Sequence, residues 1–317
     1  MADLSPFHEG ERLVQSRAGV RDELAQRAGR AIRDFMPEQH RAFFPLLSFL
    51  IVGSIDGAGQ PWASILVGRP GFIQSPDART LRIAALPAYG DPLGANLAIG
   101  ARLGLLGIQP ETRRRNRANG SIEALDTGGF TLHVEQSFGN CAKYIQARAP
   151  HFVAAPETVS VPRAVRTEGP VLSAEASALI SAADTFFIAT AAPGDGVDVS
   201  HRGGRPGFVR VSAAGGCTTL TVPDFSGNNY FMTLGNIAAD PRAGVIFVDF
   251  ETGTVLTLSC TAEIVWDGAE LAAFAGAQRL LRLSVVAGIA IADAVPLRWS
   301  APDYAPQLAT TGAWSPT

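Results

Sequence analysis

One sequence pattern occurs twice in this chain, and the repeat constrains the fold more than any other feature. Residues 68–72 read Gly-Arg-Pro-Gly-Phe, and the same five residues recur at 204–208, an offset of 136. Further along, the second copy has four extra residues, so the offset becomes 140, and it pairs Glu123 with Glu263. Because matches spread over about 60 residues describe a whole domain rather than one turn of a solenoid, we expect two similar domains that face each other. Any binding site should lie where they meet.

The bulk composition is that of a globular chain with two cores. Its 317 residues are 47% hydrophobic and 17% charged, which supplies enough apolar material for about two domains. The net charge of -3 gives no electrostatic case for nucleic acid or for an anionic membrane surface as a partner. The longest apolar stretch, residues 43–53, is too short to span a bilayer. We therefore expect neither a nucleic-acid partner nor a membrane partner.

Cysteine usage and the first residues favour a cytoplasmic location. Cys141, Cys217 and Cys260 lie far apart and show no CxxC spacing, so neither a zinc site nor a disulfide framework is expected. Three isolated thiols fit a reducing compartment, in which free cysteines are usually buried. Residues 1–12 are charged and lack the apolar run of a secretory signal.

Short apolar or alternating segments separated by glycine-rich turns predict a mainly β fold with flanking helices. Each half should form a closed or split antiparallel barrel. The predicted strands are 46–55, 61–67, 80–86, 103–109, 114–123 and 130–134 in the first half, and 185–190, 197–201, 207–211, 218–222, 245–250, 255–265 and 285–292 in the second.

Helical periodicity divides the chain further. Residues 5–35 predict a helical arm that ends before Pro37 and packs on the first domain. Shorter helices are predicted at 92–102, 173–183, 229–239 and 269–283. The expected organisation is an arm (1–36), a first barrel (37–150), a proline-rich linker (151–170), a second barrel (171–300) and a weakly ordered tail (301–317).

The usual catalytic motifs are missing from the sequence. It contains no G-x-S-x-G elbow, no H-E-x-x-H and no Walker loop, so a hydrolase has little support. The five histidines are scattered, and no pair has the spacing that a metal centre needs. No residue is therefore assigned a catalytic or metal-binding role.

The second copy contains a pattern that suits a phosphate. Arg205 and Arg210 are expected to flank a strand at 206–209, with Arg205 in the entering turn and free to reach the same anion. The loop 223–229 should open a helix, where backbone N–H groups bind anions, and arginine suits a phosphate dianion. The alternative is a surface arginine pair beside a capped helix. The candidate residues are Arg205, Arg210, Ser226, Asn228 and Asn229.

Four arginines between residues 113 and 117 fall on a predicted strand of the first half. Arg113, Arg115 and Arg117 would share one face of that strand. Such a run is usually a solvated edge that discourages aggregation. The competing interpretation is a face that points into the groove between the domains and complements an anionic cofactor or substrate.

Several of these segments together resemble pyridoxamine 5'-phosphate oxidase-related proteins, which are FMN-binding split barrels. In the second copy the resemblance lies in residues 205–210, 223–229, 240–247 and 261–263. In the first copy, residues 135–145 resemble a C-P-K-Y-like segment of one bacterial branch, with Ala142 in place of the proline. The resemblance covers about 37–150 and 171–300, and it implies two tandem split β-barrel domains.

Members of that family are usually homodimers with FMN in grooves between two barrels. The resemblance therefore implies a pseudo-dimer within one chain and leaves open a homodimer of such chains. It implies FMN as cofactor, held at its phosphate by Arg205, Arg210 and the loop 223–229. It also implies a flavin-dependent oxidoreductase that acts on a small-molecule substrate or electron donor. A reductase partner would be a separate chain, because this sequence has no iron–sulfur cysteine cluster.

The two copies depart from the family pattern to different degrees. Asn228 and Asn229 stand where the family usually carries Arg or Lys, and the first copy has Arg69 but Gln74, with Asp91 in its loop. These departures favour the alternative of a non-enzymatic protein for flavin or a haem-type ligand, or a degenerate split barrel. If one site survives, the second copy should supply its phosphate contacts. Two residues have open roles: Trp299 lies near the flavin or closes the barrel end, and His201 lies near the flavin ring or is structural.

Overall fold

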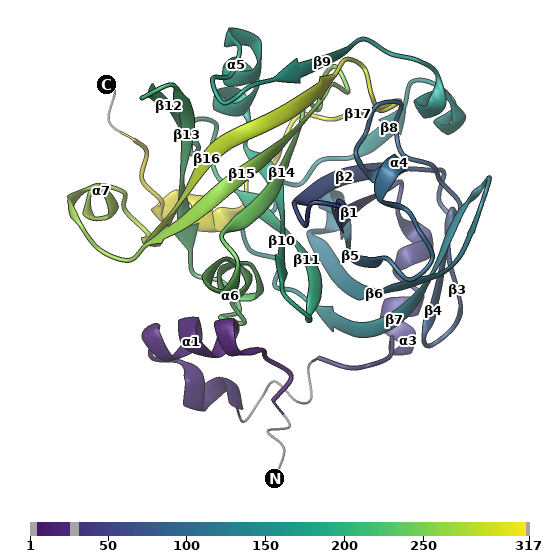
Figure 1. Ribbon diagram of the computed structural model, residues 1–317, viewed down its shortest axis with the longest axis horizontal. Coiled ribbons are helices and arrows are strands. Elements are labelled where there is room, and N and C mark those ends of the chain that lie inside the picture. Colours follow the sequence, from purple (N-terminus) through teal and green to yellow (C-terminus); the bar gives the residue numbers. More distant parts are fainter. Residues whose placement is uncertain (1–4, 26–31, 315–317) are drawn as a thin grey trace.

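The computed structural model describes residues 5–25 and 32–314, and this part of the chain contains two large antiparallel sheets (Figure 1). The first sheet has seven strands in the order β2-β1-β5-β6-β7-β4-β3. Its strands are β1 (Phe49–Ile55), β2 (Pro61–Val67), β3 (Ile73–Asp77), β4 (Thr80–Ile83), β5 (Arg102–Gln109), β6 (Arg114–Asp126) and β7 (Gly129–Gly139).

The second sheet repeats this order of strands as β11-β10-β14-β15-β16-β13-β12. The registers also repeat, since β1 aligns Ile51 with Ile65 on β2, and β10 aligns Phe187 with His201 on β11. Both positions are shifted by the 136 residues of the sequence repeat. The strands are β10 (Thr185–Ala192), β11 (Gly196–Gly203), β12 (Arg210–Ala214), β13 (Cys217–Phe225), β14 (Arg242–Val248), β15 (Val255–Val265) and β16 (Ala277–Ile291), with β9 (Val165–Glu168) paired to β16.

The two sheets meet through a close, two-fold contact that depends on glycine. A Cβ atom at Gly104 on β5 would overlap the carbonyl oxygen of Val197 on β11. At the equivalent place, a Cβ atom at Gly244 on β14 would overlap the carbonyl oxygen of Pro61 on β2. Only glycine permits such a backbone approach. Between these contacts lies one apolar core drawn from both sheets, which includes Phe49, Ile51, Ile65, Leu106, Phe187, Ala189, Val199 and Ile246.

Short helices and two further strands surround the sheets. The helices are α1 (Glu9–Arg17), α3 (Glu38–Arg41), α4 (Leu93–Asn96), α5 (Ala174–Ala182), α6 (Met232–Ala239) and α7 (Ala269–Ala272). The 3-10 helices are η1 (Phe44–Leu46), η2 (Pro110–Thr112), η3 (Pro156–Ser160) and η4 (Pro306–Thr310), and β8 (Pro150–Phe152) pairs with β17 (Leu297–Trp299). Within residues 5–25 and 32–314, no helix has the length and apolar character that crossing a membrane requires.

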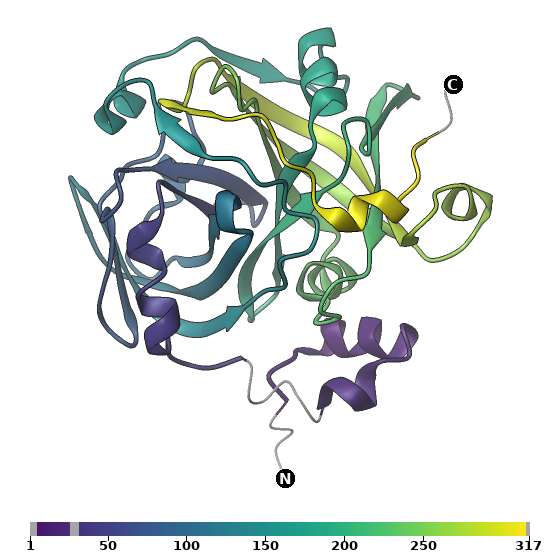
Figure 2. The same cartoon turned by 180° about the vertical axis from the view of Figure 1, so that it is seen from behind.

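The N-terminal arm differs from its prediction in two ways. The continuous helix expected over 5–35 is wrong, because α1 ends at Arg17 and Gly19 takes a left-handed φ of 73°; the part of that prediction at 26–31 lies outside the described residues. The packing prediction holds for residues 32–36, where Arg33 pairs with Ser137 of β7 in the first sheet, but α1 packs on α6 of the second half (Figures 1 and 2). There Gly10 and Gly235 let α1 and α6 touch, and His8 Nε2 lies 2.8 Å from Asn236 Oδ1.

Two predicted segments in the second half have another structure. The helix expected over 269–283 is wrong, because only α7 is helical and residues 277–291 form β16, which is paired on both sides. Its Ala- and Leu-rich composition favours helix, but burial between β13 and β15 overrides that propensity. The strand expected at 207–211 is also displaced, because Gly207 takes a φ of 83° in a turn and β12 begins at Arg210.

The segments expected to be irregular are partly structured. The linker 151–170 contributes β9 to the second sheet and places Val159 in the core between the sheets. The tail beyond residue 300 carries η4, whose Leu308 is buried, and runs across the second sheet (Figure 2). Its Trp314 donates a hydrogen bond from Nε1 to the carbonyl oxygen of Phe208, at 2.9 Å. These packing contacts order a segment whose sequence has no periodicity.

Candidate anion-binding site between the two sheets

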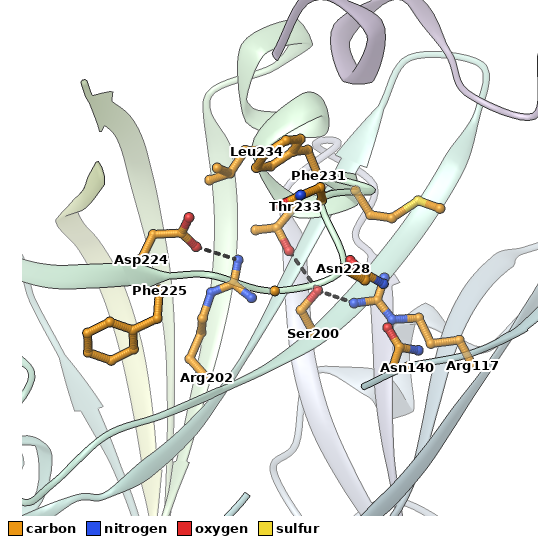
Figure 3. Close-up of a pocket in the computed structure, with 13 residues that line it drawn as sticks. Arg117, Asn140, Ser200, Arg202, Asp224, Phe225, Asn228, Phe231, Thr233 and Leu234 are labelled. Atoms are coloured by element: carbon orange, nitrogen blue, oxygen red, sulfur yellow. Dashed lines mark hydrogen bonds and ion pairs between the residues drawn. The ribbon is translucent and has the colours of Figure 1, made fainter. Parts of the chain in front are cut away.

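A small polar pocket lies where β6 of the first sheet faces β11 and α6 of the second half (Figure 3). Its volume is about 90 Å³. Arg117 comes from β6, Ser200 and Arg202 from β11, and Thr233 from the first turn of α6. The other lining residues are Asn140, Asp224, Phe225, Gly227, Asn228, Asn229, Phe231, Met232 and Leu234.

A hydrogen-bonded network fixes Arg117 in this pocket. The side chain is 6% exposed, and its guanidinium donates to Ser200 Oγ, which in turn lies 2.6 Å from Thr233 Oγ1 (Figure 3). On its other side the guanidinium lies 3.4 Å from a carboxylate oxygen of Asp198. That carboxylate also accepts from Asn236 on α6, at 3.2 Å. Arg117 is therefore preorganised by polar groups of the second half, and it also lies over the ring of Phe138 on β7 of its own sheet.

Two buried donors at this pocket have no acceptor among the residues that the structure describes. They are Nε of Arg117 and Nδ2 of Asn140. Buried polar groups in native proteins are almost always hydrogen-bonded, and each exception calls for an explanation. Both atoms are buried, so an acceptor bound in the pocket reaches them only if neighbouring side chains move.

The electrostatics around the pocket favour an anion. A second pocket of about 70 Å³ shares Arg202 and Asp224 with the first and adds Arg115 and Lys143. Asp224 is bonded to Arg202, at 3.6 Å, and to Arg279, at 3.0 Å. Within the described part of the chain, neither Arg115 nor Lys143 has a carboxylate within salt-bridge distance. The cations therefore outnumber the carboxylates, which raises the local affinity for anions.

Burial changes the pKa values of these groups without removing the positive charge. Burial lowers the pKa of Arg117 to about 10, against the opposing effect of Asp198, and it also lowers the pKa of Arg115 and of Arg202. All three stay protonated at neutral pH. His201 lines the second pocket, and burial, aided by the nearby Arg115, holds its pKa well below the usual value. His201 is therefore neutral.

Helix α6 adds backbone donors to the pocket. Its N-cap residue, Phe231, takes a left-handed φ of 60° and provides no side-chain cap. The first N–H groups of a helix lack intrahelical partners and carry a partial positive charge. Residues 231–234 line the pocket, so this helix end and the buried side chain of Arg117 lie at the same pocket.

The predicted site residues divide into two groups. Asn228 and Asn229 line the pocket, and Ser226 lies just before them in the same loop without lining it. Arg205 instead lies over the ring of Tyr304, and Arg210 forms an ion pair with Glu270 and lies over the ring of Trp314. Arg69 lies over Phe152, and Trp299 is packed between Phe49 and Phe250. The structure therefore does not bring Arg205, Arg210, Arg69 or Trp299 to the pocket.

The arginine run on β6 supplies cations to the pocket that those residues do not. The interpretation as a solvated edge is wrong, because β6 is a central strand between β5 and β7. Arg115 and Arg117 face the second half, whereas Arg114 lies over Phe43 on the other side of the strand. Arg113 precedes the strand in a left-handed conformation and bonds to Asp303. The sequence indicated a groove-facing role for this face only as the competing interpretation, and it did not indicate Arg202 or Lys143 as site residues.

The equivalent groove on the opposite side of the two-fold contact has no such cations at the matching, described positions. Arg117 aligns with Leu106 on β5, and Thr257 aligns with Ile246 on β14, so Thr257 takes the position of Arg117. By the same registers, Val255, Leu66 and Ser64 take the positions of Arg115, Arg202 and Ser200.

An internal carboxylate lies in that equivalent groove. Asp91 is buried and accepts hydrogen bonds from Ser64 Oγ, at 2.5 Å, and from the backbone N–H of Leu93 in α4, at 2.8 Å. Burial raises its pKa to about 6, against the opposing effect of these hydrogen bonds. A carboxylate bonded to this serine and helix would repel an anion in that groove.

Part of the chain is similar to a known protein family. Residues 172–294 match the model of the pyridoxamine 5'-phosphate oxidase family. Solved structures to which the chain is similar include HupZ from Group A Streptococcus (20% identity, 36% of this chain and 90% of that chain, TM-score 0.29). A second is a FAD-binding protein from Mesorhizobium loti (16% identity, 40% of this chain and 97% of that chain, TM-score 0.25). A third is the haem storage protein HutZ from Vibrio cholerae (14% identity, 37% of this chain and 92% of that chain, TM-score 0.26). No curated protein matches the chain.

Proposed function

We propose, from the relation of residues 172–294 to the pyridoxamine 5'-phosphate oxidase family, that this chain binds one flavin mononucleotide through the pocket between its sheets. The observation that carries the proposal is the pair of unpartnered buried donors, Arg117 Nε and Asn140 Nδ2, beside the uncapped end of α6. Charge-assisted hydrogen bonds from guanidinium to phosphate are strong and directional. Arg117 and Arg202 would hold the phosphate, with Asn140, Asn228 and Asn229 as neutral donors.

The pocket fits the phosphate end of a flavin better than its ring. At about 90 Å³ the space is well below the roughly 300 Å³ from which small-molecule pockets start, and the neighbouring pocket is about 70 Å³, so a ring system needs side chains of the neighbouring pocket to move aside. There Tyr144 and Phe225 stack with ring centroids 5.0 Å apart. These two rings offer an aromatic surface to a planar group, and they must move apart to admit one between them.

A bound flavin would supply the electron transfer, and the chain supplies binding and access. Arg117, Arg202 and the first turn of α6 neutralise the phosphate. Tyr144 and Phe225 line the second pocket. His201, neutral and buried, donates or accepts a hydrogen bond without acting as an acid at neutral pH. This arrangement supports a flavin-dependent oxidoreductase in which the two sheets replace the two barrels of a dimer.

The test compares FMN with riboflavin, which lacks the phosphate. We expect FMN to bind at least tenfold more tightly, measured by quenching of flavin fluorescence. Arg202→Leu and Arg117→Thr install the residues found at the equivalent positions of the other half, and each should weaken FMN roughly tenfold or more, since a charged hydrogen bond contributes about 1.5–3 kcal/mol. Riboflavin binding should change little.

Arg210→Ala is the matched control, because it removes the same charge outside the pocket. Equal affinities for FMN and riboflavin, or equal losses in Arg210→Ala and Arg202→Leu, would refute the proposed phosphate site. Thermal unfolding of each variant confirms that it is folded.

The second candidate is a protein that binds flavin or a haem-type ligand without catalysis. The small pocket volume and the neutral Asn228 and Asn229 favour it. Oxidation of a nicotinamide donor by the FMN-loaded protein separates the two functions. A rate above that of free FMN at the same concentration supports the oxidoreductase, and a rate equal to it supports the binding protein.

A further inference from the structure

A cavity much larger than the anion pocket lies apart from it, beside the end of β14 and β17. Its volume is about 460 Å³, within the usual range for a small ligand. It lies between the start of β10, the loop after β14 and the segment that follows β17. It shares no lining residue with the anion pocket among the residues that the structure describes.

Aromatic side chains form much of its wall. The rings of Phe250 and Trp299 meet edge to face, with centroids 4.9 Å apart and planes at 68°. Tyr304, in the segment that follows β17, also lines the cavity. Aromatic walls of this kind favour flat ring systems, through stacked and edge-to-face contacts.

Two buried groups in the wall retain donors without partners in the described residues. They are Nε1 of Trp299 and Nε of Arg148, and both side chains are more than nine-tenths buried. Nη2 of Arg148 lies 2.5 Å from Asp184, and its Cζ atom lies 4.1 Å from the ring centroid of Phe250. Because a buried donor left unpaired is destabilising, an acceptor on a bound molecule would remove that cost.

The charge of the cavity selects against anions. Arg148 is the cation that lines the described wall, and it is already paired with Asp184, while Arg205 lies over the ring of Tyr304 at its edge. Asp249 and Glu251 add two further carboxylates. This balance is opposite to that of the anion pocket, where cations are in excess, so the two cavities suit ligands of different charge.

We propose that this cavity binds a flat nitrogen heterocycle without negative charge that carries a carbonyl or ring-nitrogen acceptor. The ring would pack against Phe250, Trp299 and Tyr304, and the acceptor would take the hydrogen bond that Trp299 Nε1 lacks once the side chains that bury this atom move aside. The site is separate from the flavin proposal, and neither depends on the other.

The test uses nicotinamide and nicotinate, which share one ring and differ in charge at neutral pH. The chain has four tryptophans, so ¹⁵N-labelled protein gives four indole N–H signals that Trp→Phe variants assign. Nicotinamide should shift the Trp299 signal in a saturable way, and nicotinate should bind at least tenfold more weakly. Trp299→Phe keeps an aromatic ring and should weaken nicotinamide roughly tenfold, as expected for one lost hydrogen bond.

Trp62→Phe is the control, because Trp62 bonds to Asp56 in a hairpin of the first sheet. The proposal fails if nicotinamide leaves the Trp299 signal unshifted, if nicotinate binds as tightly, or if Trp299→Phe and Trp62→Phe behave alike. The shift in the unmodified protein tests the site even if Trp299→Phe does not fold. FMN titration of the same sample reports the flavin proposal independently.

Discussion

The buried carboxyl group of Glu11 should make the docking of the N-terminal arm depend on pH. Glu11 is 2% exposed at the contact between α1 and α6. One of its oxygens accepts from the backbone N–H of His8, at 2.9 Å, and the other has no partner in the described residues. Burial first, and then the nearby Asp198, raise its pKa from 4.5 to about 9.

The sign and size follow from proton linkage. A carboxyl whose pKa is higher in the docked state must take up a proton on docking at any pH between the two values. The free-energy penalty for docking is absent below pH 4.5. It grows by about 1.4 kcal/mol for each pH unit above 4.5 and becomes constant near pH 9. At pH 7 the penalty is about 3 kcal/mol, which is large for an arm of this length.

Hydrogen exchange of the α1 amides, corrected for intrinsic rates, measures this effect. Between pH 5 and pH 8 the protection of residues 9–17 should fall about tenfold per pH unit. Glu11→Gln keeps an oxygen for the His8 N–H and cannot ionise, so its protection should be nearly flat and should exceed that of the unmodified protein at pH 7. Glu9→Gln, an exposed site in the same turn, is the control. Equal pH slopes in Glu11→Gln and the unmodified protein would contradict the assignment.

Three further predictions concern stability. Asp91→Asn should remove a loss of up to about 3 kcal/mol that the unmodified protein shows as pH rises from 4 to 6; urea unfolding across that range checks it, and a persistent slope argues against it. Gly235→Ala should release the arm, because the added Cβ would overlap the backbone of α1, and limited proteolysis should cleave it sooner than Gly57→Ala, which has open space. Leu308→Ala should lower stability by about 2–5 kcal/mol, whereas the exposed Leu13→Ala should not; equal melting temperatures would mean that the tail is not part of the core.

Local patterns predict the strands that have clear alternation and clear ends. The bounds of β2 and β15 coincide with the prediction, because each alternates or is β-branched and is bounded by turns. The helix predicted over part of 277–291 is wrong because Ala and Leu suit helices as well as buried strands, and only pairing with β13 and β15 decides between them.

The anion pocket can be predicted only in part, because its residues come together through the contact of the two sheets. The loop with Asn228 and Asn229 is recognisable from its place before a helix. Arg117 and Arg202 lie on strands of different sheets, and nothing local to either strand indicates that they face each other. Arg210 has the residue type expected of a phosphate ligand, but it is paired with Glu270 from α7.

The carboxylate of Asp91 shows what a single chain permits that a symmetric pair of chains does not. In a homodimer with two-fold symmetry both grooves are made of the same residues, so an arginine in one is an arginine in the other. Here the two grooves are built from different residues of one chain. Thr257 stands in one groove where the other has Arg117, and Leu66 stands where the other has Arg202. Each groove can therefore change alone, and the flavin proposal predicts one FMN for each chain.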